Sequence, residues 1–265
     1  MFNKMLKRFA AFSYKKLNLL RLRFIFNRSP QQIVKISGQK NINKFSDRLG
    51  PSWQNESIPQ IQRELVDKQV KKFRDGNPID VFDSLVKELR CIINSEVETV
   101  LEIGCSSGYY SEVFKIAGIP LKYNGCDYSM SFIEMARAYY PGINFYVCDA
   151  RALPFDDSSF HVVISGCCIL HIREYTLAIK EAARVSSNYV IFHRTPTLAR
   201  TETAFYTKNA YGVEMLEIHF NEKELYDIFY QNNLSVVKSI PIDIQFDSKG
   251  REISGNKTYV CKKNE

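Results

Sequence analysis

The sequence predicts an α/β fold in which a mostly parallel sheet carries helices on both of its faces. Segments with strand and helix patterns alternate along the chain, as they do in doubly wound sheets. The first strand, residues 100–103, ends in a turn that contains two glycines, and the strands at 121–127 and 143–149 each end in an aspartate. Because the carboxyl ends of parallel strands meet at one edge of the sheet, the turn and the two acids are expected to lie together there.

The turn after the first strand is typical of a strand-to-helix connection that binds a ligand. An apolar run that carries Glu102 ends at Gly104, passes through Cys105 and two serines, and reaches Gly108 just before an amphipathic segment. Glycines at these two positions allow the backbone to turn sharply and to approach a ligand without a Cβ in the way. Such turns also occur without a ligand, so the interpretation depends on the residues that follow.

Those residues are the two aspartates. An acid about 20 residues after a glycine turn binds the two ribose hydroxyls of a nucleoside in doubly wound sheets, and Asp127 stands at that place. Asp149, followed by Ala150, is placed to accept a hydrogen bond from an exocyclic adenine amine. Aspartate also caps helices and turns where no ligand binds, but two of them on successive strands favour a nucleoside site.

Four runs of the sequence, residues 101–108, 125–129, 148–163 and 165–171, resemble the class I S-adenosylmethionine-dependent methyltransferases. Within these the chain is most similar to the small-molecule group that includes the quinone C-methylases. The resemblance implies a Rossmann-like, seven-stranded sheet with an antiparallel final strand, S-adenosylmethionine as cofactor and S-adenosylhomocysteine as its product. It implies a cofactor site made of Glu102, Gly104, Cys105, Gly108, Asp127, Tyr128, Asp149, Ala150, Ser165 and Gly166.

Within that site, the resemblance places Glu102 and the two glycines at the methionine end of the cofactor and Asp127 at the ribose. It places Asp149 and Ala150 at the adenine, with Ser165 and Gly166 beside the sulfonium. Ser106 departs from the family, which usually has a glycine there. A serine is small enough to fit the same turn.

Other proteins that use such a turn fit the sequence less well. A nicotinamide dehydrogenase needs three glycines at fixed spacing so that a pyrophosphate can lie on a helix N-terminus, and the third is missing here. An aminopropyl transferase shares the fold, but the chain has no acidic signature of a polyamine pocket. The predicted activity is therefore methyl transfer, and a regulatory subunit that binds the cofactor without turnover remains an alternative.

Charge is distributed unevenly along the chain. Residues 1–46 contain eleven lysines and arginines and no acid, whereas residues 47–265 contain 25 basic and 29 acidic side chains. A mildly acidic body argues against a nucleic-acid substrate that is gripped by the body. An RNA methyltransferase that uses the basic segment for grip remains a second alternative.

The basic segment, residues 1–46, is predicted to be an arm that contains an amphipathic helix. Within residues 2–26, apolar side chains such as Phe2, Leu6 and Phe9 share one helical face, and basic side chains lie opposite. This pattern is typical of an anchor on an anionic membrane surface. A transit peptide and a helix that packs on protein are the other interpretations. We expect a cytoplasmic protein, with the arm at the inner membrane surface.

Residues 47–265 are predicted to form one methyltransferase domain. Helices within residues 59–93 would act as a lid over the cofactor, and residues 195–220, which interrupt the alternation of strands and helices, would form a substrate cap. The seven cysteines are odd in number and include no C-x-x-C pair. They suggest neither a metal site nor a disulfide framework but reduced thiols.

Two histidines are the candidate catalytic residues. The protein of a methyltransferase mainly aligns donor and acceptor, and a hydroxyl acceptor also benefits from a general base. His171 follows the fourth strand and His193 ends the fifth, so both are expected to face the methyl group. The predicted acceptor is a small molecule or a membrane-associated glycan or lipid precursor, methylated on oxygen.

Overall fold

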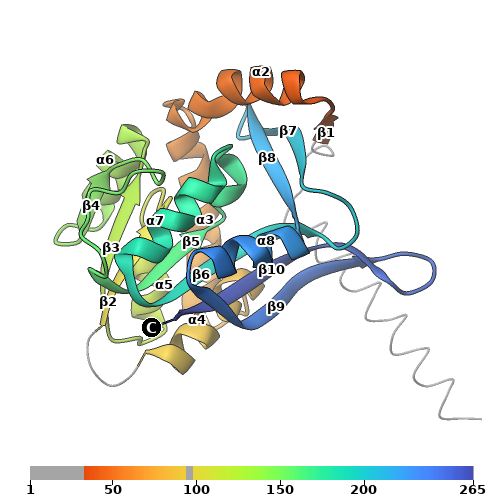
Figure 1. The fold of residues 1–265 in the computed structure, drawn as a ribbon. Helices are drawn as coiled ribbons and strands as arrows, with labels where there is room; N and C mark the ends of the chain where they lie inside the picture. Colours follow the sequence, from red (N-terminus) through yellow and green to blue (C-terminus); the bar gives the residue numbers. More distant parts are fainter. Residues whose placement is uncertain (1–32, 94–97, 265) are drawn as a thin grey trace, which may run out of the picture. The chain divides into compact units, whose positions relative to one another are not determined.

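Five parallel strands form the centre of the fold (Figure 1). The structure is a computed structural model that describes residues 33–93 and 98–264. In spatial order the five strands are β4 (Asn144–Val147), β3 (Leu121–Asp127), β2 (Glu98–Ile103), β5 (Phe160–Gly166) and β6 (Ser186–Leu198). Beyond β6, β10 (Glu252–Lys263) pairs antiparallel, and β9 (Leu234–Phe246) pairs with β10. This sheet confirms the predicted fold class, including its antiparallel strand.

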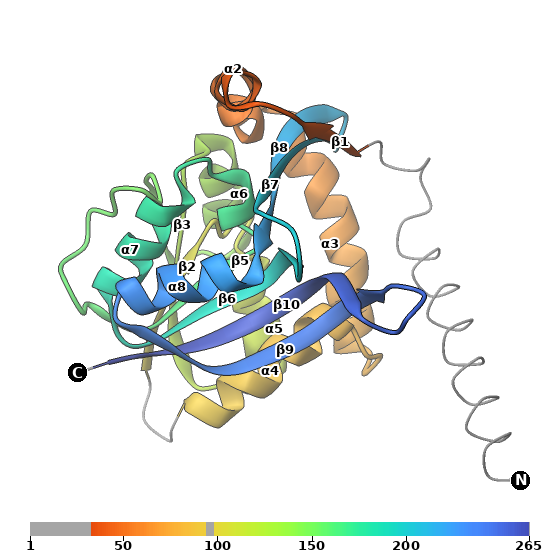
Figure 2. The ribbon, with the colours of Figure 1, turned by 45° about the vertical axis from the view of Figure 1, so that its right-hand side comes forward.

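Helices cover both faces of this sheet (Figure 2). One face packs against α4 (Asp80–Ile92), α5 (Tyr109–Ile116) and α6 (Met130–Tyr139), with α3 (Ile58–Arg74) in contact with α5 and α6. The other face packs against α7 (Tyr175–Val185) and α8 (Glu222–Gln231). The central strands are apolar on both sides, as in β5, where Val162, Val163 and Ile164 are fully buried. A run of this kind is what a strand covered by helices on both faces requires.

A small antiparallel sheet extends the fold at the carboxyl end of β6. The hairpin of β7 (Ala204–Ala210) and β8 (Val213–Asn221) lies within the predicted cap, and β1 (Ile33–Ile36) pairs with β7. The last residues of β8 pair with the end of β6. Two further segments, α2 (Gln39–Leu49) and the 3-10 turn η1 (Gly50–Gln54), contact β8.

This extension changes the boundary of the predicted arm. The compact unit begins at Ile33, so residues 33–46, which the sequence places in the arm, belong to the domain through β1 and α2. The amphipathic pattern of residues 2–26 lies outside the described residues. Among the residues that the structure describes, no helix is both long and apolar enough to span a bilayer.

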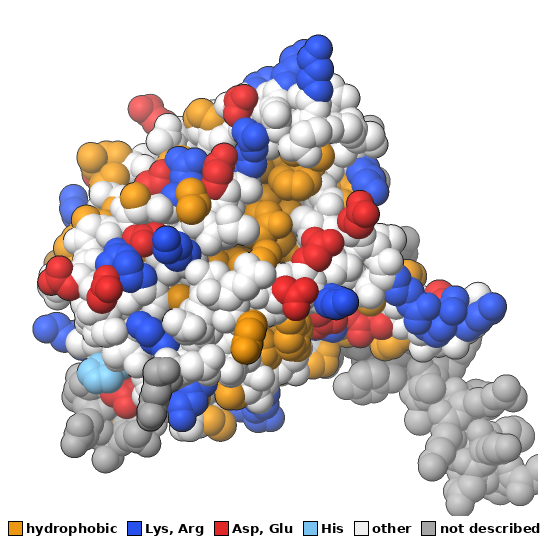
Figure 3. Space-filling view, in the orientation of Figure 1, with side chains coloured by type: hydrophobic (Ala, Val, Ile, Leu, Met, Phe, Trp, Pro, Cys, Tyr) orange, Lys and Arg blue, Asp and Glu red, His pale blue; other side chains and the backbone are white. Residues whose placement is uncertain are grey.

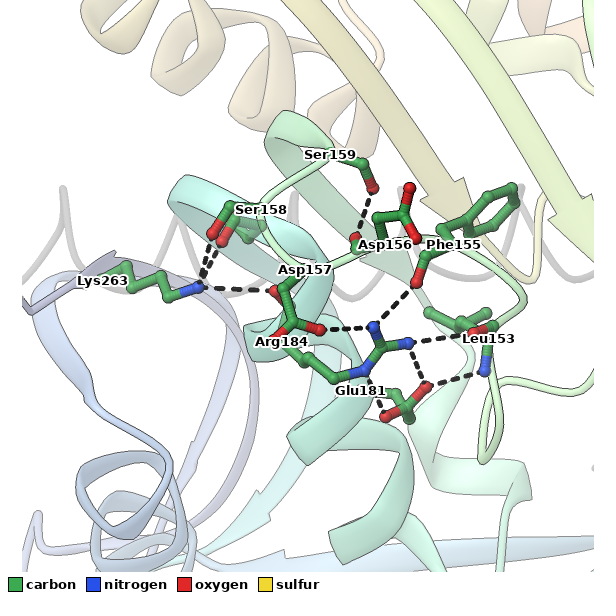
Figure 4. A network of polar contacts seen from close by, with 10 residues as sticks. Leu153, Phe155, Asp156, Asp157, Ser158, Ser159, Glu181, Arg184 and Lys263 are labelled. Carbon is green, nitrogen blue, oxygen red and sulfur yellow. Dashed lines mark hydrogen bonds and ion pairs between the residues drawn. The ribbon is translucent and has the colours of Figure 1, made fainter.

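Arg184, at the end of α7, fixes the loop that leads from β4 to β5 (Figure 4). Its guanidinium donates to the carbonyl oxygens of Leu153 and Phe155 at 2.9 and 2.7 Å and pairs with Asp157 at 2.7 Å. Glu181 pairs with Arg184 at 2.8 Å and accepts from the Leu153 amide at 2.8 Å. Since this loop starts at Asp149, the network holds one side of the predicted nucleoside site in place.

Candidate active site

The glycine turn is folded onto the end of β3. Gly104 and Ser106 both have left-handed backbone angles, with φ of +71° and +47°. The amides of Gly104 and Cys105 donate to the Cys126 carbonyl oxygen at 2.8 and 3.0 Å. A Cβ on Gly104 would lie 2.6 Å from Sγ of Cys168, which follows β5. Gly104 is therefore required by the packing of the turn itself, in addition to any ligand.

Asp127 lies at the centre of the site. Its side chain is buried, and its two carboxylate oxygens accept hydrogen bonds from the amides of Ser129 and Ser106, each at 3.0 Å. Burial raises the pKa of Asp127 to about 6, although these hydrogen bonds oppose the shift. Among the described residues it has no cationic partner. Each oxygen keeps a lone pair that is able to accept from a ligand hydroxyl.

Glu102, on β2, is a second buried carboxyl group next to Asp127. It is 2% exposed and accepts a hydrogen bond from the Tyr123 hydroxyl. Burial raises its pKa to about 8, the hydrogen bond from Tyr123 opposes this shift, and the charge of Asp127 adds to it. One carboxylate oxygen lies 3.0 Å from where a Cβ on Gly166 would be. Within the described part of the chain, Glu102 has no cationic partner either.

The predicted adenine side of the site is more exposed. Arg151 binds both carboxylate oxygens of Asp149, at 2.6 to 3.0 Å, and lowers the pKa of that carboxyl group. Ala150 is buried beside it. The Tyr128 hydroxyl donates to the Gly50 carbonyl oxygen at 2.9 Å. An adenine amine would therefore share Asp149 with Arg151.

The ends of β2 and β5 contribute small polar side chains to the same edge of the sheet. Ser165, at the end of β5, and Ser107, in the glycine turn, are both buried, and their hydroxyl oxygens have no hydrogen-bond partner within residues 33–93 and 98–264. Cys105 is buried in the turn, with Sγ 3.7 Å from the Ser106 carbonyl oxygen. Gly108 begins α5, where a Cβ would lie 2.6 Å from the Phe145 ring. Buried hydroxyls without partners are typical of sites that a polar ligand completes.

His171 reaches the edge from the 3-10 turn η2 (Ile169–His171). Its Nδ1 lies 2.6 Å from the Leu216 carbonyl oxygen. A carbonyl only accepts, so Nδ1 carries the proton and Nε2 of the neutral ring keeps a lone pair. The Trp53 ring packs edge-on against this imidazole, with a centroid separation of 4.8 Å. Nε2 keeps the lone pair that a base needs, and the ring also contacts the Cys167 thiol.

His193 is placed differently. Its side chain is 0% exposed, and its Nδ1 lies 2.7 Å from the Thr258 hydroxyl. Burial and the neighbouring Arg194 charge lower the pKa of His193 to about 3, so the ring is neutral at ordinary pH. A buried ring with so low a pKa is a poor general base. We therefore assign His193 to positioning of its strand rather than to proton transfer.

Two residues of the site escaped the sequence analysis as functional candidates. Trp53, in η1, packs against Phe132, His171 and Tyr211 with centroid separations of 4.8 to 6.4 Å. It lies next to Tyr128, which follows β3, and to His171, which follows β5. Arg194 follows His193 directly and lies beside Cys167. In the sequence, the signal for Arg194 was a basic residue directly after a candidate catalytic histidine at the predicted end of a strand.

Comparison with known proteins identifies the domain. Residues 101–191 match the family described as the methyltransferase domain. A demethylmenaquinone methyltransferase from Chlorobaculum tepidum is 34% identical over 87 residues, which are 32% of this chain and 35% of the relative. A phthiotriol/phenolphthiotriol dimycocerosates methyltransferase from Mycobacterium tuberculosis is 31% identical over 90 residues, 32% of this chain and 33% of the relative. The chain thus spans about a third of these relatives.

A solved structure matches over a larger share of the chain. The 1,6-didemethyltoxoflavin-N1-methyltransferase of Burkholderia thailandensis, with 1,6-didemethyltoxoflavin and S-adenosylhomocysteine bound, superimposes with a TM-score of 0.53 at 12% identity. The match covers 91% of this chain and 98% of that one, and it shows the fold. The family match and the relatives place a class I S-adenosylmethionine-dependent methyltransferase domain at residues 101–191, and the solved structure adds that the fold is shared.

Proposed function

We propose that the protein transfers a methyl group from S-adenosylmethionine to a small molecule or to a membrane-associated glycan or lipid precursor. The observation that carries the proposal is the pair of buried carboxyl groups, Glu102 and Asp127, which lie at the ends of adjacent strands without a cationic partner among the described residues. Buried carboxyl groups are retained where a partner offsets their cost. A ligand that carries both a cation and vicinal hydroxyls would supply such partners.

The residues at this edge fit S-adenosylmethionine. Asp127 would accept hydrogen bonds from the ribose hydroxyls, and Asp149 with Ala150 would border the adenine. Glu102 would face the ammonium group of the methionyl end, and the Ser165 hydroxyl, which has no partner among the described residues, would lie beside the sulfonium. The cofactor supplies an activated methyl group on a cationic sulfur. The chain's own task is to align an acceptor with that methyl group and to keep water out.

For an oxygen acceptor, the chain also offers a proton acceptor. The Leu216 carbonyl fixes the His171 tautomer, so that Nε2 is free to take the proton of an acceptor hydroxyl. Trp53 packs on the same ring and restricts its rotation. O-methylation is accordingly the reaction that we propose.

We expect His171→Ala to lower the rate of methyl transfer about 100-fold or more, because a positioned general base contributes about 10²- to 10⁴-fold. S-adenosylhomocysteine should bind as before. The measurement is transfer of labelled methyl from S-adenosylmethionine into a fractionated cell extract. Label in a lipid, glycan or small-molecule fraction supports the proposed substrate class, and label in RNA or protein contradicts it. Turnover by the variant at the wild-type rate would remove His171 from the mechanism.

The arm carries the proposed membrane association. The face of the described unit in Figure 3 shows acidic and basic side chains interspersed, whereas residues 1–32 contain basic residues and no acid. We expect the full chain to sediment with vesicles of anionic lipid, and a chain that starts at Ile33 to stay in the supernatant while it still binds S-adenosylhomocysteine. A full chain with Lys15→Glu and Lys16→Glu is the matched control and should bind vesicles weakly. Equal sedimentation of all three chains would contradict the proposal.

A further inference from the structure

Strand β6 contains a bulge that sets the direction of one side chain. Phe192 pairs with Tyr259 on β10 and Thr195 pairs with Lys257, so two residues of β6, His193 and Arg194, oppose the single residue between those partners. Arg194 has a left-handed backbone angle, with φ of +58°. Bulges of this kind turn a side chain out of the regular alternation and are common beside active sites. The conformation costs free energy for a residue with a Cβ, which the surrounding structure must offset.

The bulge is fixed in place and lies at the carboxyl end of β5. The Cys167 amide donates to the His193 carbonyl oxygen at 2.8 Å, which joins the end of β5 to the bulge. The His193 ring contacts the Thr258 hydroxyl through Nδ1 at 2.7 Å, which joins the bulge to β10. Contacts of the bulge with β5 and β10 therefore fix the position of Arg194 on β6.

The Arg194 guanidinium lies among a thiol and phenols, and no carboxylate of the described residues pairs with it. Its charged neighbours in their ionised form would be the Cys167 thiol and the phenols of Tyr110, Tyr109 and Tyr211, and together they raise the pKa of Arg194 although burial opposes this. Cys167 follows β5 directly, Tyr109 and Tyr110 begin α5, and Tyr211 lies in the turn of the β7–β8 hairpin. These groups come from both the cofactor edge and the predicted cap.

Within the described part of the chain, Arg194 forms no ion pair and no side-chain hydrogen bond, although it is only partly exposed. Other partly buried arginines do have carboxylate partners: Arg184 pairs with Glu181 at 2.8 Å. Two acids act on the groups around Arg194: Glu217, beside Cys167, is already paired with Lys208 at 2.6 Å and His219 at 2.9 Å. Glu102, beside Tyr109 and Tyr110, accepts from the Tyr123 hydroxyl and is not paired with Arg194. A partly buried guanidinium without a counter-charge is a binding site for an anion, and its planar donors suit carboxylate and phosphate.

The Cys167 thiol is not a permanently charged partner for the Arg194 guanidinium. Burial alone would raise its pKa, but the charge of Arg194 and the neighbouring His171 ring lower it to about 7. The thiol is therefore only partly ionised at neutral pH, and a thiolate accepts weaker hydrogen bonds than an oxygen anion does. An oxygen anion on a ligand would be the stronger partner.

We propose that Arg194 binds a carboxylate or phosphate group on the methyl acceptor, which makes the acceptor an anionic molecule. This inference rests on the proposed function, because it assigns a substrate class to the same site. The methionyl end of the cofactor also carries a carboxylate and is the other possible source of the anion. The acceptor is favoured because Arg194 lies on β6, two strands from the glycine turn on β2, and beside Tyr211 of the cap hairpin.

The test uses the full chain and two probes, inorganic phosphate and benzoate, with neutral benzamide as the matched control ligand. Each is titrated in the presence and absence of S-adenosylhomocysteine, and binding is followed by calorimetry and by the fluorescence of Trp53, the single tryptophan of the chain. At least one anion should bind the wild type, and Arg194→Gln should weaken that binding at least tenfold. Arg194→Lys should retain part of it, and Arg251→Gln, at an exposed arginine in the hairpin of β9 and β10, should leave it unchanged. Benzamide should not compete.

The outcomes separate this inference from the proposed function. Failure of the wild type to bind S-adenosylhomocysteine would contradict the proposed function itself. Normal binding of S-adenosylhomocysteine together with no anion binding, or with equal anion binding by Arg194→Gln, would overturn the role of Arg194. If Arg194→Gln weakens S-adenosylhomocysteine but not methylthioadenosine, which lacks the carboxylate, Arg194 serves the cofactor and the acceptor assignment is wrong. Thermal unfolding of each variant checks that the bulge is retained.

Discussion

Replacement of Asp127 by alanine is expected to weaken the binding of S-adenosylhomocysteine roughly 100-fold, because two charge-assisted hydrogen bonds to the ribose would be lost. Asp127 also accepts from the amides of Ser106 and Ser129, so the alanine variant loses part of the support of the glycine turn. Calorimetric titration of the ligand into both proteins measures the change in affinity, and urea unfolding measures the change in stability.

Two further variants distinguish the loss of ribose contacts from a distorted turn. Asp127→Asn keeps one oxygen acceptor for an amide of the turn but no negative charge, and we expect affinity between those of the wild type and the alanine variant. Asp149→Ala should weaken binding less than Asp127→Ala, because the Asp149 carboxylate is partly exposed and already shared with Arg151. Binding by Asp127→Ala within threefold of the wild type would show that this carboxylate does not hold the ligand.

The second large effect is expected at Glu102. In the folded protein its pKa is about 8, against an ordinary value of 4.5. Between those two values the folded state holds one proton more than the unfolded state, so the free energy of unfolding falls as the pH rises, by at most about 1.4 kcal/mol per pH unit. Glutamine has no proton to lose and still accepts a hydrogen bond from Tyr123. Glu102→Gln should therefore be more stable than the wild type at pH 8, by roughly 3 kcal/mol, and nearly equal to it at pH 5.

Urea unfolding of both proteins from pH 5 to pH 8, without ligand, measures this difference. Asp127, whose pKa is raised to about 6, also titrates in this range and interacts with Glu102, so the same pair of proteins is compared with Asp127→Asn in both. Binding should show the opposite preference, since a cationic ammonium group favours an ionised Glu102. The affinity of the wild type for S-adenosylhomocysteine should rise from pH 6 to pH 8, and that of Glu102→Gln should be lower and nearly constant. Parallel stability curves for the two proteins would contradict a buried, protonated Glu102.

Much of the fold could be predicted because its signals are local. The strands β2, β3 and β4 lie close to the predicted strands at 100–103, 121–127 and 143–149, since each is an apolar run that ends at a turn residue. The strands β7 and β8 were not predicted, because residues 195–220 were expected only to form a cap that interrupts the alternation. The β1 strand could not be predicted, because its residues become a strand only by pairing with β7, where Ile36 lies opposite Phe205. The same long-range pairing explains why the predicted arm extends too far into the domain.

The candidate site also has one part that the sequence predicts and another that depends on long-range packing. Glu102 and Asp127 follow from strand ends and a glycine turn, which are visible in the sequence, and the structure shows them as neighbouring buried acids. The burial of His193 and the left-handed backbone of Arg194 depend on a bulge that forms only against β10, more than 60 residues later in the chain. No pattern around residues 193–194 reveals that bulge. The position of Trp53 over the site likewise depends on how η1 packs on β8.

A crystal structure of the full chain with S-adenosylhomocysteine would test the central claim most directly. We expect the ribose hydroxyls to lie on the Asp127 carboxylate, the ammonium group to face Glu102, and Trp53 to move or repack to admit the ligand. Arg194 should then point to open space beside the sulfur, ready for an acceptor. A ligand bound elsewhere, or crystals soaked in excess ligand in which this edge remains filled by Trp53, would contradict the assignment of the site.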